Sequence, residues 1–326
     1  RVGQRLWIPI GGAQPAPGAG ATGTSQAVVP TPSGQLYTFG YGFQIDPYDG
    51  SKLLTAVAAV QSAGFGWVKI QVPWQNLEPA QKGVYNWSSL DGIMNQFSAA
   101  GLKVMLSIVK APDWARPGST DFKVEGPPED PQDLADTMAA IATRYKGKLH
   151  ALEVWNEQNL AYEWGNEPLD AARYVRLLCA VYRSVKVVDP SIAIISGGLT
   201  PTGVTAAGIS VDDLDYLRQM YAAGCKACMD GLGAHPSGYN NPPDVRADYT
   251  DAAEPNFKGH RSFYFQETML SYRTVMASYN DANKLIWPTE FGWASSSSPL
   301  PNYEYAANVT EAEQAQYLVQ AYQMMK

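Results

Sequence analysis

From residue 36 to the end of the chain, short apolar runs alternate with longer segments whose apolar residues recur at helical spacing. The run 102–109 is almost continuously apolar, as strands of a parallel sheet are when both of their faces are buried. The segment 89–100 instead has one apolar helical face, formed by Leu90, Ile93, Met94 and Phe97. Repeated strand–helix pairs of this kind predict an α/β fold built on a parallel sheet.

The pattern repeats seven times, which favours a TIM (β/α)8 barrel over an open doubly wound sheet. The predicted strands are 36–45, 67–72, 102–109, 149–155, 192–196, 230–234 and 284–288. The predicted helices are 51–63, 89–100, 131–145, 169–187, 211–223, 258–279 and 311–325. No G-x-G-x-x-G follows the first strand, which argues against dinucleotide binding. Because the sequence stops at Lys326, we expect a barrel truncated before its eighth strand, with two unpaired edges.

The N-terminal region has a different composition from the rest. Residues 11–35 are dominated by Gly, Pro, Ala, Ser and Thr, and such a segment is predicted to be a linker. Residues 1–10 are too few to fold alone, and a plain N-terminal tail is one interpretation of them. The predicted organisation is therefore a remnant at 1–10, a linker at 11–35 and a barrel domain at 36–326.

Charge and hydropathy exclude two classes of partner. The net charge of −7 argues against a nucleic-acid partner, because such proteins present basic surfaces to phosphates. No run approaches the 18 or so apolar residues that a membrane-spanning helix requires, so we expect no membrane span. The chain has only 3 His, which disfavours a metal-dependent hydrolase, and we expect no metal.

The 3 cysteines give a weak signal. Cys225 and Cys228 form a single C-x-x-C pair, and no second pair is present to complete a zinc site. We interpret these two as loop thiols or as a small-loop disulfide. Cys179 lies within an apolar helical pattern and is predicted to be a buried free thiol.

Two of the predicted strands end in a glutamate among aromatic residues. Glu157 follows the strand 149–155, and Glu290 follows the strand 284–288. Active sites of TIM barrels lie at the C-terminal ends of the strands, so we expect the two carboxylates to share the barrel mouth. Glycoside hydrolysis needs two carboxylates that flank one bond, one protonated and one ionised. The alternative is that each glutamate is only a strand-end salt bridge or a helix cap.

These motifs resemble those of clan A of the glycoside hydrolases, retaining enzymes on this barrel, and most closely those of families 39 and 5. The resemblance covers about residues 36–326 and includes the segments 74–79, 83–87 and 111–115. It implies that Glu157 is the general acid/base, that Asn156 donates to the sugar 2-hydroxyl and that Glu290 is the nucleophile. Separately, residues 2–9 resemble the closing strand of a LysM domain, a module that binds N-acetylglucosamine-containing cell-wall polymers.

The resemblance and the strand-end positions add further candidates for substrate binding. His235 ends the sixth strand, where relatives often carry a His or Tyr near the nucleophile, and Tyr239 is a candidate for the same neighbourhood. Lys69 takes the place of an Arg that relatives commonly carry near the nucleophile. Four Trp are placed to stack on sugars, of which we expect two to do so: Trp114, Trp155, Trp164 and Trp293. His150 and His260 are interpreted as structural.

The sequence therefore predicts a retaining glycoside hydrolase that cleaves a polysaccharide or oligosaccharide without a cofactor. The linker and the LysM-like segment suggest a secreted or cell-wall-associated protein. The alternative is a non-catalytic carbohydrate-binding barrel of the cell envelope, which Lys69 and the truncation favour. The sequence leaves the sugar, the linkage and the choice between endo and exo cleavage open.

Overall fold

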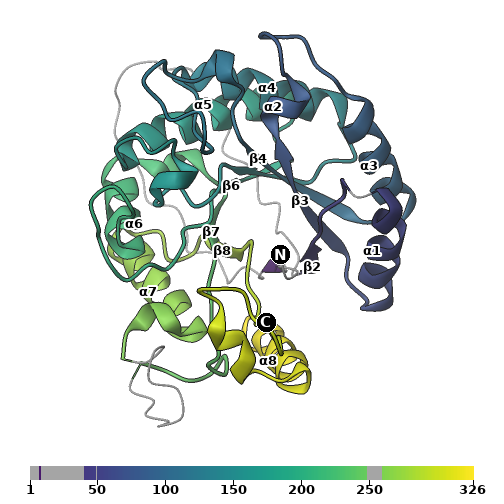
Figure 1. Ribbon diagram of the computed structural model, residues 1–326. Coiled ribbons are helices and arrows are strands. Elements are labelled where there is room, and N and C mark those ends of the chain that lie inside the picture. Colours follow the sequence, from purple (N-terminus) through teal and green to yellow (C-terminus); the bar gives the residue numbers. More distant parts are fainter. Residues whose placement is uncertain (1–6, 9–39, 49, 248–258) are drawn as a thin grey trace, which may run out of the picture.

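The computed structural model describes residues 7–8, 40–48, 50–247 and 259–326. Parallel strands follow one another in sequence order around a curled sheet, with the helices outside it (Figure 1). The parallel strands are β2 (Gly40–Gln44), β3 (Trp67–Pro73), β4 (Lys103–Val109), β5 (Ala151–Val154), β6 (Ala193–Ser196), β7 (Gly231–Ala234) and β8 (Leu285–Pro288). The predicted fold, a TIM barrel truncated before its eighth parallel strand, is thus confirmed over the described part of the chain.

A helix follows each of these strands close to the predicted place. The main helices are α1 (Gly50–Ser62), α3 (Ser88–Ala99), α4 (Pro131–Arg144), α5 (Ala171–Val188), α6 (Asp213–Ala222), α7 (Phe265–Ser278) and α8 (Glu311–Met324), and a short helix α2 (Trp74–Leu77) follows β3. The predicted helix 258–279 was too long at its start. His260 accepts a hydrogen bond from the Ser262 amide, and the 3₁₀ turn η5 (Arg261–Phe263) replaces the first predicted helical turns.

One further strand comes from the N-terminal region. β1 (Trp7–Ile8) pairs antiparallel with β2 and also lies against β8, so it sits between the first and last parallel strands. These two residues belong to the LysM-like segment, and here they extend the barrel sheet. The rest of that segment and the predicted linker 11–35 lie outside the described residues.

Side chains alternate between the two faces of the strands and so form two cores. The outward-facing residues, such as Val68 and Ile70 on β3, join the main core with the helices. The inward-facing residues form a smaller apolar layer inside the barrel, made of Trp67, Met105, Ala151, Ala193, Ile195 and Trp287. Two residues further along β3 and β5, the interior becomes polar at Lys69 and Glu153, both fully buried. The barrel interior therefore changes from apolar to charged toward the C-terminal ends of the strands.

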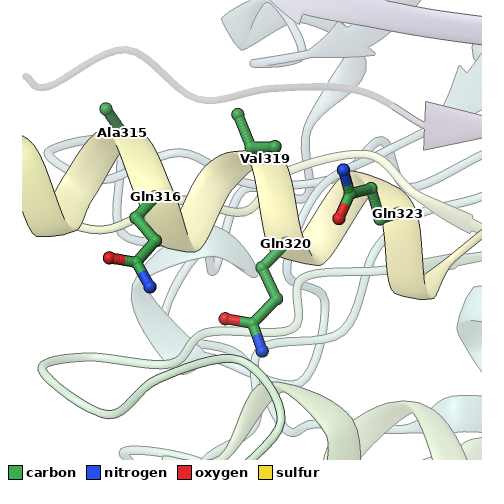
Figure 2. A pocket seen from close by; sticks show the side chains of 5 residues that line it. All are labelled: Ala315, Gln316, Val319, Gln320 and Gln323. Atoms are coloured by element: carbon green, nitrogen blue, oxygen red, sulfur yellow. The ribbon is translucent and has the colours of Figure 1, made fainter.

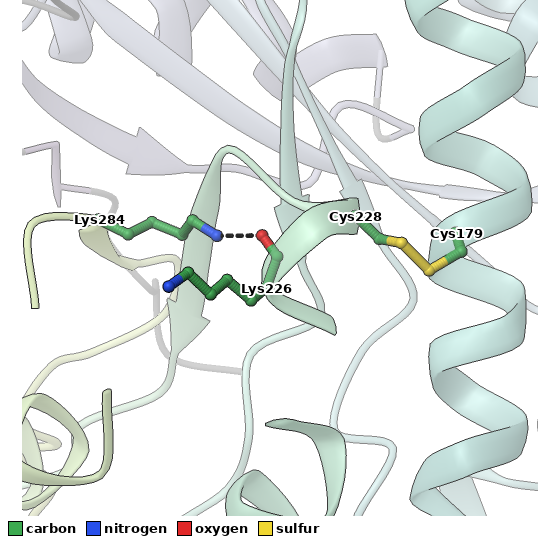
Figure 3. Close-up of a disulfide and its surroundings, with 4 residues drawn as sticks. All are labelled: Cys179, Lys226, Cys228 and Lys284. Carbon is green, nitrogen blue, oxygen red and sulfur yellow. Dashed lines mark hydrogen bonds between the residues drawn. A yellow bond between two sulfur atoms is a disulfide. The ribbon is translucent and has the colours of Figure 1, made fainter. Parts of the chain in front are cut away.

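A disulfide joins α5 to the 3₁₀ turn η3 (Cys225–Cys228), which leads into β7 (Figure 3). Cys179 and Cys228 form it with a Cα–Cα distance of 4.8 Å, and Cys225 is a buried free thiol. Both predictions for the cysteines were therefore wrong. In a C-x-x-C turn the two thiols need not face each other: here Cys228 contacts α5, whereas Cys225 packs into the core. Beside the disulfide, Lys284 donates to the Lys226 carbonyl at 2.5 Å.

Removing this disulfide is expected to destabilise the fold. The two cysteines are 49 residues apart in sequence, and opening a loop of this size costs about 2–4 kcal/mol of unfolding free energy. Denaturant unfolding of a Cys179→Ser/Cys228→Ser variant measures the loss, with oxidised wild type as the reference. An equal midpoint for the two proteins would show that the disulfide adds nothing to stability.

The outer side of α8 carries a shallow hollow of about 520 Å³ (Figure 2). Its lining is uncharged and consists of Ala315, Gln316, Val319, Gln320 and Gln323. It lies on one helix and away from the charged end of the barrel interior, so it is not part of the site described below. Among the described helices, none combines the length and the apolar character that crossing a membrane requires.

Candidate active site

A buried lysine stands at the base of the candidate site. Lys69 on β3 lies 2.7 Å from Glu153 Oε2 and 3.2 Å from Glu290 Oε1. Burial opposes the charge of Lys69, but Glu153 and Glu290 outweigh it and raise the pKa of this ammonium group. The predicted proximity of Lys69 to Glu290 is therefore observed. Glu153 was not predicted, although its place two residues after Ala151 on β5 gives it the same inward direction.

The chain leaves β5 in an unusual conformation. Trp155 has φ 72° and Glu157 has φ 43°, in the left-handed region that bulky L-residues rarely adopt. The Glu157 amide donates to the Gly198 carbonyl at 3.0 Å, which fixes the turn against the end of β6. Gly198 itself has no room for a side chain, since an added Cβ would lie 2.3 Å from His235. These contacts hold Glu157 against the conformational preference of its own backbone.

Glu157, His235 and Glu290 converge at the C-terminal ends of β5, β7 and β8. His235 Nδ1 lies 2.8 Å from Glu157 Oε1 and 3.9 Å from Glu290 Oε2. One ligand atom from each of the three residues lies within 4.8 Å of the other two, so this trio could also hold a metal ion. The two carboxylates that the sequence placed at separate strand ends thus share one site. His235 was expected near Glu290, and it is closer to Glu157.

The ionisation of Glu157 and that of His235 depend on each other. Burial would raise the pKa of Glu157, but the hydrogen bond and charge of His235 outweigh it and lower that pKa. Burial would lower the pKa of His235, but Glu290 and Glu157 raise it. The 2.8 Å contact therefore favours an ionised Glu157 carboxylate next to a protonated His235 ring.

A line of hydrogen bonds connects Glu290 to a further acid. Gln71 donates to Glu290 Oε1 at 3.3 Å and to Asn156 Oδ1 at 3.2 Å. Asn156 is in turn hydrogen-bonded to Glu163, on the 3₁₀ turn η2 (Ala161–Glu163) after β5. Sequence reasoning missed both Gln71 and Glu163. Gln71 could have been found, because it lies two residues after Lys69 and so points to the same side of β3; nothing in the sequence marks Glu163.

Burial, with the charges of Glu157 and Glu125, raises the pKa of Glu163 to about 8. The unfolded chain should release this proton near pH 4.5, whereas the native protein keeps it up to about pH 8. Glu163 therefore makes the native state lose stability as pH rises through this window, and the loss stops above it. Glu163→Gln cannot titrate, so we expect wild type to lose stability relative to this variant between about pH 5 and pH 8.

Denaturant midpoints of the two proteins across that range measure the difference. Glu129→Gln serves as a matched control because Glu129 is exposed and distant from the trio in the fold. A difference between wild type and Glu163→Gln that stays constant with pH would contradict the protonated state of the half-buried Glu163 side chain.

Most of the predicted tryptophan platforms are packing residues. Trp155, Trp164 and Trp293 are at most 2% exposed, so none offers a ring face to a sugar. Trp155 and Trp293 are held by their indole N–H groups, which donate to the carbonyls of Glu163 and Asn241. Trp114 is half-buried, lies edge-on to Trp74 and donates to the Glu78 carbonyl. The expectation that two of the four stack on sugars is therefore not met, because their indoles fill the space between the strand ends and the helices.

The remaining candidates fall into two groups. Tyr239 is half-buried after β7, and burial together with the nearby Glu157 charge raises its pKa, which places it beside the trio as expected. His150 and His260 each accept a hydrogen bond from a backbone amide, as structural histidines do. Neither lies in the trio.

Comparison with known proteins gives one partial sequence match. Residues 44–118 match a family model described as beta-galactosidase, which is less than a quarter of the chain. No curated protein matches the sequence.

Solved structures match over much more of the chain. A family 39 glycoside hydrolase from the gut symbiont Bacteroides cellulosilyticus shares 22% identity at a TM-score of 0.61, covering 87% of this chain and 52% of that one. A glucosidase from Croceicoccus marinus shares 15% identity at a TM-score of 0.53, covering 83% and 53%. A family 39 β-xylosidase from Caulobacter crescentus shares 18% identity at a TM-score of 0.52, covering 87% and 58%.

The chain spans somewhat over half the length of each of these structures. At these identities the likeness concerns the fold. The chain therefore has the TIM-barrel architecture that these glycoside hydrolases share, described here over its first seven parallel strands.

Proposed function

We propose that this protein is a retaining glycoside hydrolase that cleaves O-glycosidic bonds in a polysaccharide or oligosaccharide. Glu290 is the nucleophile and Glu157 is the general acid/base. The observation that carries the proposal is the closeness of their carboxylate oxygens, which lie within 4.8 Å of each other. Retaining enzymes hold their two carboxyl groups about 5–5.5 Å apart, whereas inverting enzymes leave about 6.5–9.5 Å for a water molecule.

In the first step, Glu290 attacks the anomeric carbon and Glu157 gives its proton to the leaving oxygen. The glycosidic C–O bond breaks, and a glycosyl ester forms on Glu290. In the second step, Glu157 takes a proton from water, which attacks the anomeric carbon and restores the Glu290 carboxylate. Lys69 and Gln71 contact Glu290 Oε1 and orient the other carboxylate oxygen for attack.

The hydrogen bond between Glu157 and His235 keeps a proton beside Glu157, from where it can reach the leaving oxygen. In the free protein this proton is drawn toward His235, which accounts for the lowered pKa of Glu157. When Glu290 becomes a neutral ester, the site loses one negative charge and Glu157 is favoured as a base. Asn156 has two amide hydrogens, so one is left for a sugar 2-hydroxyl after its bond to Glu163.

The geometry of the trio argues for acid–base chemistry over a metal site. The 2.8 Å contact between His235 and Glu157 is a hydrogen-bond distance. Ligands bound to one Zn²⁺ at about 2.0–2.1 Å in tetrahedral geometry would lie more than about 3 Å apart. Activity that survives exhaustive chelation would agree with this assignment, and activity lost on chelation and restored by a metal would contradict it.

The test is the configuration of the first-formed product. A panel of polysaccharides and aryl glycosides identifies a substrate, and NMR then follows the anomeric proton early in hydrolysis. We expect the product to keep the configuration of the substrate. Inversion would refute the mechanism, and carbohydrate binding without any turnover would favour the non-catalytic barrel.

We also propose that the protein acts outside the cytosol, in a secreted or cell-wall-associated form. The Cys179–Cys228 disulfide supports this, because such bonds persist in oxidising compartments. Thiol titration of the protein isolated from its source would test it, and fully reduced cysteines would contradict it. Binding of cell-wall glycan through residues 1–10 stays a prediction.

A further inference from the structure

Four tyrosines from three separate loops gather beside Glu157. Tyr162 lies on η2 after β5, Tyr239 follows β7, and Tyr303 and Tyr305 lie at the 3₁₀ turn η6 (Glu304–Asn308) after β8. We call these four residues the tyrosine rim. Tyr162 and Tyr303 are 52% and 54% exposed, an unusual state for large aromatic side chains at two loops that meet at one site.

Ring contacts join three of the four tyrosines, and the fourth lies near them. Tyr305 is 5.2 Å from Tyr239 and 6.1 Å from Tyr303 between ring centroids. Tyr303 also interacts electrostatically with Tyr162, which connects the β8 loop to the β5 loop. Burial and then Glu157 raise the pKa of both Tyr162 and Tyr239, so these two hydroxyls lie near the proposed acid/base. The rim is therefore one surface next to Glu157.

The position of the rim defines which part of a substrate it meets. Glu290, Lys69 and Gln71 lie deeper, where the sugar that forms the ester must bind. Glu157 faces the leaving oxygen, so groups beside it that are open to solvent face the leaving group. Exposed tyrosine rings supply a flat apolar face together with a hydroxyl, which suits the face of a pyranose.

Acidic neighbours narrow the class of sugar. Glu163 and Glu125 both interact electrostatically with Tyr162 or its neighbour Glu157. Glu125 pairs with Lys110 at 2.5 Å, and Glu163 keeps its proton up to about pH 8. At neutral pH the carboxylate charge beside the rim is therefore that of Glu157, whose pKa, despite burial, is lowered by His235. An anionic sugar bound at the rim would meet this charge at short range.

We propose that the tyrosine rim is a binding subsite for the leaving-group sugar and that it accepts a neutral pyranose and rejects a uronate. This inference rests on the proposed glycosidase activity. Because the second step can use a sugar hydroxyl in place of water, the same subsite must bind acceptors. An acceptor O–H then gives its proton to Glu157, and its oxygen takes the glycosyl group from Glu290.

The experiment measures the ratio of transfer to hydrolysis. A glycosyl fluoride of the sugar found in the panel is the donor, because its leaving group has no ring for the rim to bind. Methyl β-glucopyranoside and methyl β-glucuronoside are the acceptors, which differ only at C6. For wild type we expect transfer to the glucoside to exceed transfer to the glucuronoside.

Tyr303→Ala and Tyr162→Ala should each lower the ratio for the glucoside by roughly five-fold. Tyr303→Phe keeps the ring and should keep most of the ratio. Tyr279→Ala is the matched control, because Tyr279 ends α7 at the opposite end of the barrel, where it stacks on Tyr221. The ratio is internal to each protein, so a variant that merely lowers the active fraction does not change it.

The possible failures can be told apart. If wild type does not consume any glycosyl fluoride, the proposed function is wrong, and this inference falls with it. If the fluoride is consumed but both alanine variants keep the wild-type ratio, the glycosidase stands and the subsite is overturned. Equal transfer to the two acceptors would overturn the selectivity for a neutral sugar.

Discussion

Glu290→Gln is expected to reduce kcat/KM by about 10⁴-fold or more, because an amide cannot form the glycosyl ester. Losses of this size are typical when one member of a set of catalytic residues that act together is removed. The substitution keeps the shape of the side chain and removes its charge. Lys69 then keeps Glu153 as its anionic partner at 2.7 Å, so the fold should survive. Initial rates on an activated aryl glycoside, with circular dichroism as the check on folding, measure the effect. A folded Glu290→Gln variant with full activity would refute the nucleophile assignment.

Glu157→Ala provides the matched comparison, because the activity that this variant loses should depend on the leaving group of the substrate. For a sugar leaving group, loss of the general acid costs on the order of 10²–10⁴-fold. For a dinitrophenyl leaving group, which departs without protonation, the first step should be nearly intact and the ester should accumulate. Added azide should then restore turnover and yield a glycosyl azide of retained configuration. Equal losses on both substrates would contradict the acid/base role.

Lys69→Met is expected to affect stability and rate together. It leaves Glu153 and Glu290 facing each other in the barrel interior without a cation. Loss of one partner from a buried ion pair typically costs about 3–5 kcal/mol. The orientation of Glu290 should suffer as well, with kcat reduced by roughly 100-fold. Denaturant unfolding and single-turnover kinetics measure the two effects.

Lys69→Arg separates charge from shape. Arg keeps the positive charge and can form a bidentate contact with a carboxylate, so we expect most of the unfolding free energy to return. A Lys69→Met variant as stable and as active as wild type would show that the buried cation has no role. Recovery of stability without recovery of kcat in Lys69→Arg would show that the compact ammonium group is required for catalysis.

The sequence predicted the order of the elements well, because each strand is short and apolar and each helix carries one apolar face. It also placed Glu157 and Glu290 together, since all strands of a parallel barrel point the same way. Of the Lys69–Glu153 ion pair, only Lys69 was predicted to belong to the site. A single buried Glu within an apolar strand gives no sign of its partner until the barrel curvature brings β3 and β5 near each other.

Other errors arose where sequence spacing does not determine direction. The C-x-x-C spacing suggested a local pair, but the side-chain directions on η3 bring Cys228 to Cys179 on α5. The exposure of aromatic residues could not be inferred either. Tryptophans near strand ends are buried here, whereas the exposed rings beside Glu157 are tyrosines from loops without a repeating pattern.

The left-handed backbone at Trp155 and Glu157 has a consequence for how this protein tolerates mutation. The placement of the acid depends on outside supports, chiefly the Gly198 carbonyl and the space that Gly198 leaves for His235. Damage to those supports should inactivate the protein even though they need not touch a sugar. Harmful substitutions should therefore extend to the β6–β7 side of the barrel mouth. In a map of mutational sensitivity, the residues that support Glu157 should stand out as clearly as Glu157 and Glu290 themselves.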